Sequence, residues 1–534
     1  MRYHKVYMRK YFKKLPQFSL NYHFLILLSS AFIVFCLNDF FHTTFKTAAH
    51  QAGFDYLIWL NGTIHTLILA LAFEIITLRL SVKYIIGIVL LLCSVCGFYM
   101  DSLSVVFDED IIQSIFETHI DEAFDLISFG LIQYVLLFGV LPAVLLAFIK
   151  VKKVPFIRAF FQKLAFIVIL SVLIGGSYGL WGKDIVFVFK AQKKLENMLN
   201  PISPLRSLFL YVQNLQEENF VPTLIAQDAY LMQTTPPQIV VLVIGESARS
   251  ANFALNGYTK PTNPYTNALD VISFKDFYSC GVVTAISVPC MLTNYTQETY
   301  TNRNLSLYIN NILDIAQSVG YEVWYLGNNG GKCVGGCDRN IKHTLLYPSD
   351  SFDGVMLPDI QKIIAGAQKM QRNTFVVVHQ YGSHGASYNK RYPKDWTRFT
   401  PVCEQKELSK CTYEEIVNAY DNSLVYSDWV LAQIIENLKK VTSMRSMLWY
   451  VSDHGESLGE LGQYMHGGLG YTLAPKYQKH IPSIMWFSAG WERFPNAAKT
   501  RVNDHLSHDY VFHTLLHILG IQTKDYQSTL DIMP

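Results

Sequence analysis

The sequence predicts two parts of different kinds, an α-helical membrane bundle of about five spans followed by a soluble α/β domain. Two observations lead to this prediction. Long apolar runs fill the first third of the 534 residues, and only 16% of all residues are charged, against about 25% in a typical soluble protein. From about residue 236 onward, short apolar runs alternate with polar, glycine-containing loops, as they do in α/β domains.

Five segments are apolar over the length, about 20 residues, that a helix needs to cross a membrane. They are residues 22–41, 57–78, 84–100, 126–148 and 164–180. The second segment contains Asn61, His65 and Glu74. Because polar groups are costly in lipid, we expect these three side chains to face the interior of the bundle or a membrane interface.

The basic residues predict the orientation of the bundle. Lysine and arginine are frequent at the N-terminus and in the loops that follow the second and fourth segments. The loops on the other side contain few, and the loop at residues 101–123 is acidic. By the positive-inside rule the N-terminus is cytoplasmic, and five crossings place the C-terminal domain outside. The first segment lacks a small-residue cleavage pattern after it, so we expect an uncleaved anchor.

We therefore expect a transmembrane domain at residues 1–181, a linker at residues 182–235 and a soluble domain at residues 236–534. Within the linker, residues 186–199 have helical spacing with lysines on one side. This stretch is either an amphipathic helix on the membrane surface or an ordinary connecting helix.

Six of the nine cysteines lie in the soluble domain as three close pairs: Cys280 and Cys290, Cys333 and Cys337, Cys403 and Cys411. The other three lie in predicted membrane helices. An even number, paired locally in an oxidising compartment, predicts three disulfides. A cysteine-rich metal site and free core thiols are the alternatives.

Four apolar runs of the soluble domain end abruptly in polar residues. The first run ends at Glu246 and Ser247, the second at Asn328 and Lys332, the third at His379 and His384, and the fourth at Asp453 and His454. Runs that are apolar at nearly every position are typical of central strands in a parallel sheet, with helices expected at 305–319, 357–370 and 413–438. Active sites of such sheets lie beyond the carboxyl ends of the strands, so these polar groups should converge.

Glu246, Asp453 and His454 supply two carboxylates and one imidazole. This mixture suits zinc, whose catalytic sites have three protein ligands and one exchangeable position. Taken alone, the Asp-His-Gly motif also fits a simple turn before a glycine.

Thr284 is the best candidate for a nucleophile near such a metal, because it follows a loop and precedes a helical stretch whose amide groups favour negative charge. The alternative is that it only caps this helix. A bridge between the flanking Cys280 and Cys290 would hold the loop rigid.

His384 and His466 lie in glycine-flanked loops and not in apolar runs. They could bind a second metal, bind a phosphate or protonate a leaving group, although a lone histidine in such a loop is often only a surface residue. Asn328 and Lys332 could hold phosphate oxygens. His505 and His508 give a weaker signal, and we do not include them among the candidates.

Five motifs together resemble the lipid A phosphoethanolamine transferases, which include enzymes associated with polymyxin resistance. They are VIGESAR, NGYTKPTNP, SCGVVTAISVPCM, HQYGSHGASYNKRYP and YVSDHGESLGE followed by YMHG. The resemblance covers the whole chain. It implies an alkaline-phosphatase or sulfatase-like domain in the periplasm, on a monomer anchored in the bacterial inner membrane by several spans.

The resemblance also implies roles for individual residues. Glu246, Thr284, Asp453 and His454 fall on the family's zinc positions, with Thr284 as the nucleophile. His384 and His466 fall on positions that bind substrate or a second zinc, and Asn328 and Lys332 fall near positions that contact phosphoethanolamine. In the membrane loop, Ser114 stands where the family often has asparagine, and Glu122 falls on its acidic position; both would contact the donor.

The expected reaction moves phosphoethanolamine from phosphatidylethanolamine to a lipid A phosphate through a covalent threonine intermediate, which confers resistance to cationic peptides. Three alternatives stay open. The acceptor could be a lipopolysaccharide core sugar, a glucan or a protein; the chain could be a phosphoglycerol transferase of the lipoteichoic-acid-synthase type; or it could be a membrane scaffold with a decayed phosphatase-like domain. A net charge of +2 gives no support to nucleic-acid binding.

Overall fold

We describe the fold from a computed structural model of the chain. The structure describes residues 18–117, 124, 126–192, 195–217, 223–232, 236–348, 351–491 and 493–534. The chain divides into two compact units. The membrane unit consists of the residues up to Ile112 and of Ser128–Gln213, and the sheet unit consists of Gln113–Ile127 and Asn214–Pro534.

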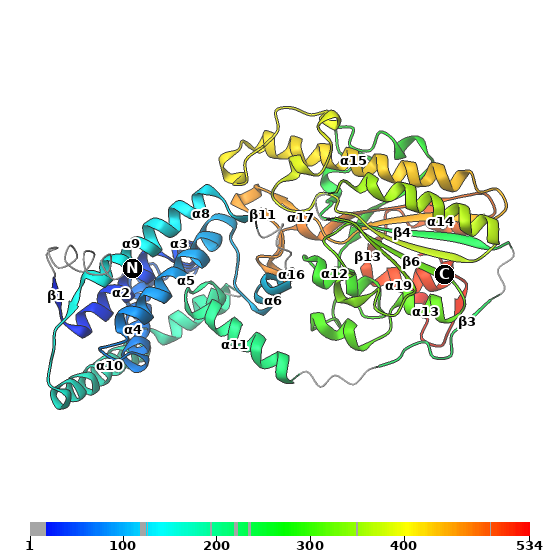
Figure 1. The fold of residues 1–534 in the computed structure, drawn as a ribbon. Coiled ribbons are helices and arrows are strands. Elements are labelled where there is room, and N and C mark those ends of the chain that lie inside the picture. Colours follow the sequence, from blue (N-terminus) through cyan, green and yellow to red (C-terminus); the bar gives the residue numbers. More distant parts are fainter. Residues whose placement is uncertain are drawn as a thin grey trace, which may run out of the picture. The chain divides into compact units, whose positions relative to one another are not determined.

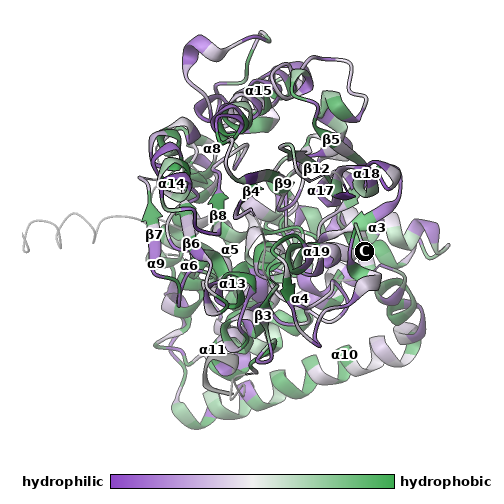
Figure 2. Cartoon of the chain, turned by 90° about the vertical axis from the view of Figure 1, so that its right-hand side faces the viewer, coloured by the Kyte–Doolittle hydropathy of each residue, from purple (hydrophilic) through white to green (hydrophobic). Residues whose placement is uncertain are grey.

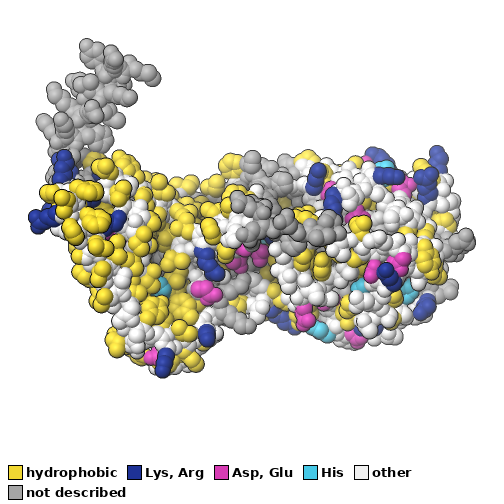
Figure 3. All heavy atoms as spheres, turned by 90° about the horizontal axis from the view of Figure 1, so that it is seen from below, with side chains coloured by type: hydrophobic (Ala, Val, Ile, Leu, Met, Phe, Trp, Pro, Cys, Tyr) yellow, Lys and Arg dark blue, Asp and Glu magenta, His cyan; other side chains and the backbone are white. Residues whose placement is uncertain are grey.

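The membrane unit is helical. Its main helices are α2 (Tyr22–Cys36), α3 (Asp39–Gln51), α4 (Leu57–Ile76), α5 (Val82–Leu103), α8 (Phe129–Tyr134), a π-helical turn (Val135–Val140), α9 (Leu141–Phe148), α10 (Phe156–Ala191) and α11 (Ile202–Glu217). Four helices of the described chain are long and apolar enough to cross a membrane, or up to five if α2 and α3 form one bent span. Hydrophobic side chains gather on the surface of this unit (Figure 3), and α10 is hydrophobic along most of its length (Figure 2).

The prediction of one continuous helix at residues 22–41 is wrong, because α2 and α3 meet at an angle of 70°. The Asn38 side chain explains the break. Its amide nitrogen donates to the Ile33 carbonyl at 2.9 Å and to the Asn200 carbonyl at 3.1 Å, and its oxygen accepts from the Asn200 amide at 2.8 Å. The side chain therefore joins the end of α2 to the distant backbone of Asn200 at the point where the helix bends.

The last membrane helix is longer than predicted. We expected it at residues 164–180, whereas α10 runs from Phe156 to Ala191 and includes the first ten residues of the predicted linker. Hydropathy identifies only the apolar middle of such a helix. Lys163 and Lys190, near its two ends, fit a helix because their long side chains can reach polar surroundings.

The three polar residues of α4 are buried, as we predicted for residues that face the bundle interior. Glu74 is fully buried, and its Oε1 lies 2.8 Å from Nδ1 of His23 in α2. Asn61 and His65 are 1% and 6% exposed.

The sheet unit contains an eight-stranded sheet in the order β13-β5-β12-β9-β4-β8-β6-β7. The four predicted strands are its centre: β9 (Arg445–Ser452), β4 (Gln238–Gly245), β8 (Thr374–His379) and β6 (Glu322–Gly327). They are neighbours and parallel, as predicted. The remaining strands are β5 (Ile272–Tyr278), β7 (His343–Leu346), β12 (His480–Phe487) and β13 (His505–Ser507), with β12 antiparallel to both neighbours.

Helices cover both faces of the sheet (Figure 1), because alternate residues of each central strand point to opposite faces. Val240, Leu242 and Ile244 of β4 join the core beneath α12 (Thr284–Met291), α13 (Ile312–Ser318) and α19 (Val511–Ile518). Ile239, Val241 and Val243 join the core beneath α14 (Leu357–Met370) and α15 (Tyr413–Lys439). The prediction of an α/β domain is confirmed.

The helices predicted at 357–370 and 413–438 are confirmed, whereas the one predicted at 305–319 is wrong in its first half. There the chain forms a 3-10 helix at Arg303–Tyr308, and α13 begins only at Ile312. Asn311 separates the two because its side chain and that of Asp314 form a capping box.

The three predicted disulfides are confirmed. They join Cys280 to Cys290, Cys333 to Cys337 and Cys403 to Cys411. Cys36, Cys93 and Cys96 of the membrane unit are free thiols.

Candidate metal centre

Two central strands of the sheet deliver three potential metal ligands to one point. Glu246 directly follows β4, and Asp453 and His454 directly follow β9. The Nε2 atom of His454 lies 3.4 Å from Oε1 of Glu246 and 3.3 Å from Oδ2 of Asp453. All three side chains are buried. The sequence-predicted ligands are thus brought together in the geometry of a metal site.

One oxygen of Asp453 is held by the backbone and the other is not. Oδ1 accepts hydrogen bonds from the amides of Ser247, at 3.0 Å, and His454, at 2.7 Å. Oδ2 is buried and has no hydrogen-bond partner in the described part of the chain. A buried carboxylate oxygen without a partner is unfavourable unless a cation satisfies it.

His454 has the protonation state that a metal ligand requires. Its Nδ1 lies 2.9 Å from the Gly455 carbonyl oxygen and donates to it, so Nε2 carries the lone pair that faces the two carboxylates. Burial, followed by the neighbouring His466, lowers the pKa of His454 to about 3. The imidazole is therefore neutral at physiological pH.

The two carboxylates oppose each other electrostatically. Burial and the negative charge of Glu246 raise the pKa of Asp453 well above its ordinary value. Burial also acts to raise the pKa of Glu246, but the hydrogen bond with His379 and the proximity of the other imidazoles outweigh it and lower that pKa. A divalent cation between the carboxylates would remove this conflict, and two oxygens with one imidazole nitrogen are ligands that zinc accepts.

Backbone conformation aims Glu246 and Asp453 at each other. Ser247 has a φ of 56°, so the chain turns sharply at the end of β4. A left-handed serine costs about 1 kcal/mol or more and is found mainly where surrounding contacts enforce it. Gly382, with a φ of 51°, packs on this turn, because a Cβ there would lie 2.8 Å from the Glu246 carbonyl oxygen.

Thr284 is the first residue of α12, and its hydroxyl belongs to the same cluster. Its Oγ1 lies 3.2 Å from Oε2 of Glu246 and 3.3 Å from Nε2 of His454. Val283, and not Thr284, is the N-cap residue of α12. The alternative of a simple capping threonine is therefore wrong. Thr284 is half-buried, so substrate can reach a hydroxyl whose neighbours are fully buried.

His466 is half-buried and lies beside the cluster. Its ring centroid is 4.0 Å from that of His454, and its Nδ1 lies 2.7 Å from Oε2 of the buried Glu456. His454, Glu456 and His466 form a second group of potential metal ligands, which shares His454 with the first. The His384 ring is 6.2 Å from that of His466. Both predicted histidines thus lie beside the centre.

Asn329, and not the predicted Asn328, reaches the centre. Its Nδ2 donates to Oε2 of Glu246 at 2.6 Å. The Asn328 amide is fully buried and donates to Asp353 at 2.8 Å, and Asp353 in turn accepts from the Gly382 amide. Asn328 therefore acts on Glu246 only indirectly. The predicted Lys332 is exposed on the following loop, where its charge acts on Asp338.

The two predicted donor contacts in the membrane loop have different outcomes. Ser114 lies in α6 (Glu109–Glu117), and its hydroxyl accepts a hydrogen bond from Arg303 at 3.1 Å. Both residues belong to the sheet unit. Glu122 lies outside the described residues.

Sequence reasoning missed two residues that border the centre, Asn329 and Glu456. His379, which the sequence places at a strand end, is the last residue of β8, and its Nε2 lies 3.8 Å from Oε2 of Glu246. Asn329 lies two residues beyond β6 and obeys the same strand-end rule. Glu456 stands three residues after Asp453 on the same loop. Applying the strand-end rule to every polar residue, not only the most familiar motifs, would have found them.

Comparisons with known proteins agree with this architecture. A family model described as Sulfatase matches residues 238–521, and one described as Phosphoethanolamine transferase EptA/EptB matches residues 65–215. The phosphoethanolamine transferase EptA of Escherichia coli is 32% identical to this chain and covers 96% of it, and 97% of that protein is covered in turn. The phosphatidylethanolamine transferase Mcr-1 of Escherichia coli is 31% identical, over 84% of this chain and 86% of its own.

A solved structure matches the whole fold. The integral membrane protein lipooligosaccharide phosphoethanolamine transferase A from Neisseria meningitidis superposes with a TM-score of 0.88 and 27% identity, over 97% of this chain and 99% of that one. The chain is thus an integral membrane transferase with a periplasmic soluble domain, the sheet unit. It belongs to the phosphoethanolamine transferase family, within the alkaline phosphatase and sulfatase superfamily.

Proposed function

We propose that this enzyme transfers phosphoethanolamine from phosphatidylethanolamine to a phosphate of lipid A through a covalent intermediate on Thr284. The observation that carries the proposal is the position of the Thr284 hydroxyl, which contacts both Glu246 and His454 at the first turn of α12. The names of two relatives support the substrates: one is a phosphatidylethanolamine transferase, and the other acts on lipooligosaccharide.

Zinc is the metal that we assign to Glu246, Asp453, His454 and the Thr284 hydroxyl. When bound, it would polarise this hydroxyl and neutralise charge on the phosphoryl oxygens. One ion would satisfy the buried Oδ2 of Asp453, which has no partner among the described residues. A second ion would have to share His454 with the first, so we assign one zinc ion and leave His466 for proton transfer.

In the first half-reaction, Thr284 Oγ1 forms a bond to the donor phosphorus, and the bond from phosphorus to the diacylglycerol oxygen breaks. Glu246 accepts the hydrogen bond of the hydroxyl and so lies in the path along which its proton leaves. His466 protonates the departing diacylglycerol oxygen. Glu456 holds Nδ1 of this imidazole, which leaves Nε2 to donate the proton.

In the second half-reaction, an oxygen of the acceptor phosphate attacks the phosphothreonine, and the bond to Thr284 Oγ1 breaks. His466 takes the proton of the acceptor if it carries one, and Thr284 recovers its own. Asn329 and His384, both half-buried beside the centre, hold the phosphoryl oxygens. A phosphoryl group that waits on the enzyme allows two lipid substrates to visit one site in turn.

We place the chain as a monomer in the inner membrane, because both lipid substrates can reach the periplasmic surface of that membrane. Each transfer adds an ammonium group to an anionic lipid. A less negative lipid A binds cationic peptides and polymyxins more weakly, so we propose that the enzyme confers resistance to them.

Mass spectrometry of lipid A from a Gram-negative host that lacks the modification tests the proposal, with Thr284→Ala as the control. A phosphoethanolamine adduct that requires Thr284 is the expected result. An adduct that the Thr284→Ala chain also produces would refute the covalent mechanism. A labelled head group that appears on core sugar, glucan or protein instead would refute lipid A as the acceptor, and a transferred phosphoglycerol would refute the assigned donor.

A further inference from the structure

Two buried polar residues in α4 have no role in the chemistry above. Glu74 contacts His23 through Oε1, whereas its Oε2 has no partner among the described residues. Nδ2 of Asn61 also has none, and His65 interacts with the backbone of Asn61 without a hydrogen bond of ordinary length and angle at Nδ1. The two residues are one helical turn apart and therefore lie on the same face of α4. Unsatisfied polar groups inside a membrane bundle point to a ligand.

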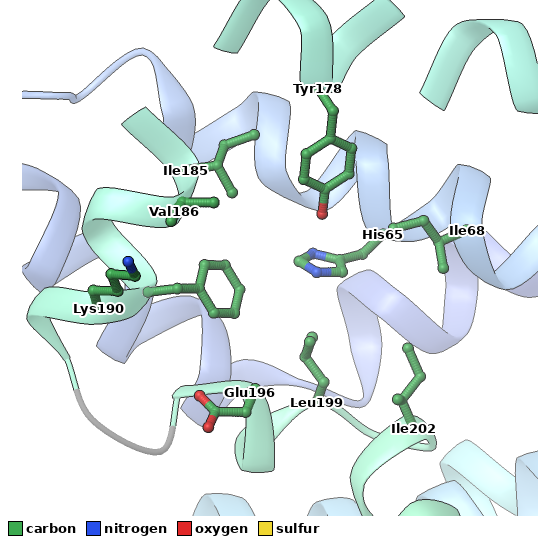
Figure 4. A pocket seen from close by; sticks show the side chains of 10 residues that line it. His65, Ile68, Tyr178, Ile185, Val186, Lys190, Glu196, Leu199 and Ile202 are labelled. Carbon is green, nitrogen blue, oxygen red and sulfur yellow. The ribbon is translucent and has the colours of Figure 1, made fainter. Parts of the chain in front are cut away.

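A cavity of about 470 Å³ opens beside His65. This volume lies within the range of about 300–1,000 Å³ that is typical of small-molecule sites. Figure 4 shows the imidazole of His65 and the hydroxyl of Tyr178 pointing into the cavity. Ile68, Ile185 and Leu199 are among the apolar residues that form its wall.

Two opposite charges line the same cavity. Lys190 belongs to the last turn of α10, and Glu196 belongs to the 3-10 helix at Leu195–Met198. Both are exposed, so a ligand can reach them without displacing packed side chains. The cavity thus combines an ammonium, a carboxylate, an imidazole and a phenol with an apolar wall. These groups match a molecule that carries a phosphate, an ammonium group and hydrocarbon.

The cavity lies at the periplasmic side of the bundle. The sheet unit is periplasmic and follows α10 in the chain, so the C-terminal end of α10 faces the periplasm. Tyr56, just before α4, donates a hydrogen bond to Asp184 near that end of α10, so both helix ends are at this surface. His65 is eight residues into α4, a depth of about 12 Å along the helix. This is the level of the outer leaflet.

We propose that this cavity is a binding site for the zwitterionic head group and upper acyl chain of an outer-leaflet phosphatidylethanolamine. The lipid phosphate accepts a hydrogen bond from Lys190, and its ammonium group pairs with Glu196. About 18 Å further along α10, Tyr178 and His65 donate to the ester oxygens of the lipid. The acyl chain follows the apolar wall. The assignment rests on the proposed function in one respect, because it identifies the ligand with the proposed donor.

Photo-crosslinking of the full-length Thr284→Ala chain in phosphatidylglycerol nanodiscs tests the site without any turnover. The probe is phosphatidylethanolamine with a photoreactive group near the glycerol. We expect saturable labelling of the α4 and α10 segments around the cavity, competed by unlabelled phosphatidylethanolamine. Lys190→Ala and Glu196→Ala should each weaken the apparent affinity about tenfold, as expected when one charge-assisted contact is lost. Lys183→Ala, an exposed lysine of the same helix that does not line the cavity, should leave it unchanged.

Labelling that does not saturate, or that is equal in the Lys190→Ala and Lys183→Ala chains, would overturn the site. A parallel assay with the chain that retains Thr284 distinguishes failure of the binding site from failure of the proposed function. If the head group of labelled phosphatidylethanolamine reaches Thr284 with an unchanged KM in Lys190→Ala, the cavity is not a donor site. If saturable labelling occurs but no head group reaches Thr284, the cavity binds the lipid and the proposed donor chemistry is wrong.

Discussion

The imidazole of His508 accepts a hydrogen bond from the backbone amide of Cys280, with Nδ1 and the amide nitrogen 3.1 Å apart. Its Nε2 donates to the Ser452 carbonyl oxygen at 2.9 Å. Cys280 belongs to the loop that leads to Thr284, and Ser452 precedes Asp453. One buried side chain, which no sequence pattern singles out, thus connects the loop before Thr284 to the strand that ends before Asp453. Burial lowers the pKa of His508 to about 4, which preserves the neutral form that both hydrogen bonds require.

Variants at His508 should separate these two bonds. Asparagine places an acceptor near the position of Nδ1 and glutamine places a donor near that of Nε2, whereas alanine keeps neither. We expect His508→Ala to lower kcat for transfer at least about tenfold, since small misplacements of reacting groups have large effects. His508→Asn should retain more kcat, and His508→Gln should retain more zinc. Steady-state kinetics with zinc analysis checks this, and unchanged kcat in His508→Ala would contradict it.

Substitution of Gly335 should act on Thr284 from a distance. Gly335 has a φ of 73°, and a Cβ there would lie 2.5 Å from Cβ of Pro289 in α12. Gly336 has a similar φ of 68°, but a Cβ there would meet the flexible side chains of Leu307 at 3.3 Å and Arg339 at 3.6 Å, so it is a matched control. Both alanine variants should lose about 1–3 kcal/mol of stability through backbone strain. Only Gly335→Ala should also lose transfer activity at saturating donor, and equal activity in the two variants would argue against the coupling.

The centre of the sheet and the cluster of candidate metal ligands were predictable for one physical reason. Strands buried on both faces must be apolar at nearly every position, so a polar residue such as Glu246 or Asp453 marks the end of a strand. The pattern does not define the first residue whose side chain turns into the site, so it predicts Asn328 where the neighbouring Asn329 contacts Glu246. The outer strands of the sheet were harder to predict. The charged Lys275 and Asp276 give β5 the hydropathy of a surface segment, and local hydropathy does not identify the strands with which β5 pairs.

The break between α2 and α3 could not be predicted from the apolar run. It depends on the reciprocal hydrogen bonds of Asn38 and Asn200, which are far apart in sequence. Likewise, the role of His508 depends on two backbone atoms from separate loops. A side chain that acts only through long-range contacts leaves no local pattern.

Removal of the metal should reveal the repulsion between Glu246 and Asp453. Asp453→Asn keeps the oxygen that accepts from Ser247 and His454 but removes one negative charge from a buried pair. In the presence of a chelator, we expect Asp453→Asn to unfold at a higher temperature than the wild type, because like charges no longer face each other. With zinc, the wild type should unfold at a higher temperature than Asp453→Asn, since zinc binding stabilises a chain that keeps the Asp453 carboxylate. Thr284→Ala keeps the three remaining ligands and should still gain stability from zinc. Thermal unfolding with and without chelator checks all three chains, and a wild type that is more stable than Asp453→Asn in chelator would refute the argument.

Asp428 of α15 should make the sheet unit less stable as the pH rises from about 4 to about 6. Its carboxylate accepts hydrogen bonds from the Tyr265 amide, at 2.8 Å, and from Asn263 and Thr266. Burial nevertheless dominates and raises the pKa of Asp428 to about 6. Between the unfolded and folded pKa values the folded state keeps a proton that the unfolded chain has released, so each pH unit in this window lowers the free energy of unfolding by up to about 1.4 kcal/mol.

Asp428→Asn cannot titrate. The stability of the wild type relative to this variant should therefore decrease between pH 4 and pH 6 and stay constant above it, as measured by denaturant unfolding of the full chain in detergent. A stability difference that is the same at pH 4 and pH 7 would show that Asp428 is charged throughout.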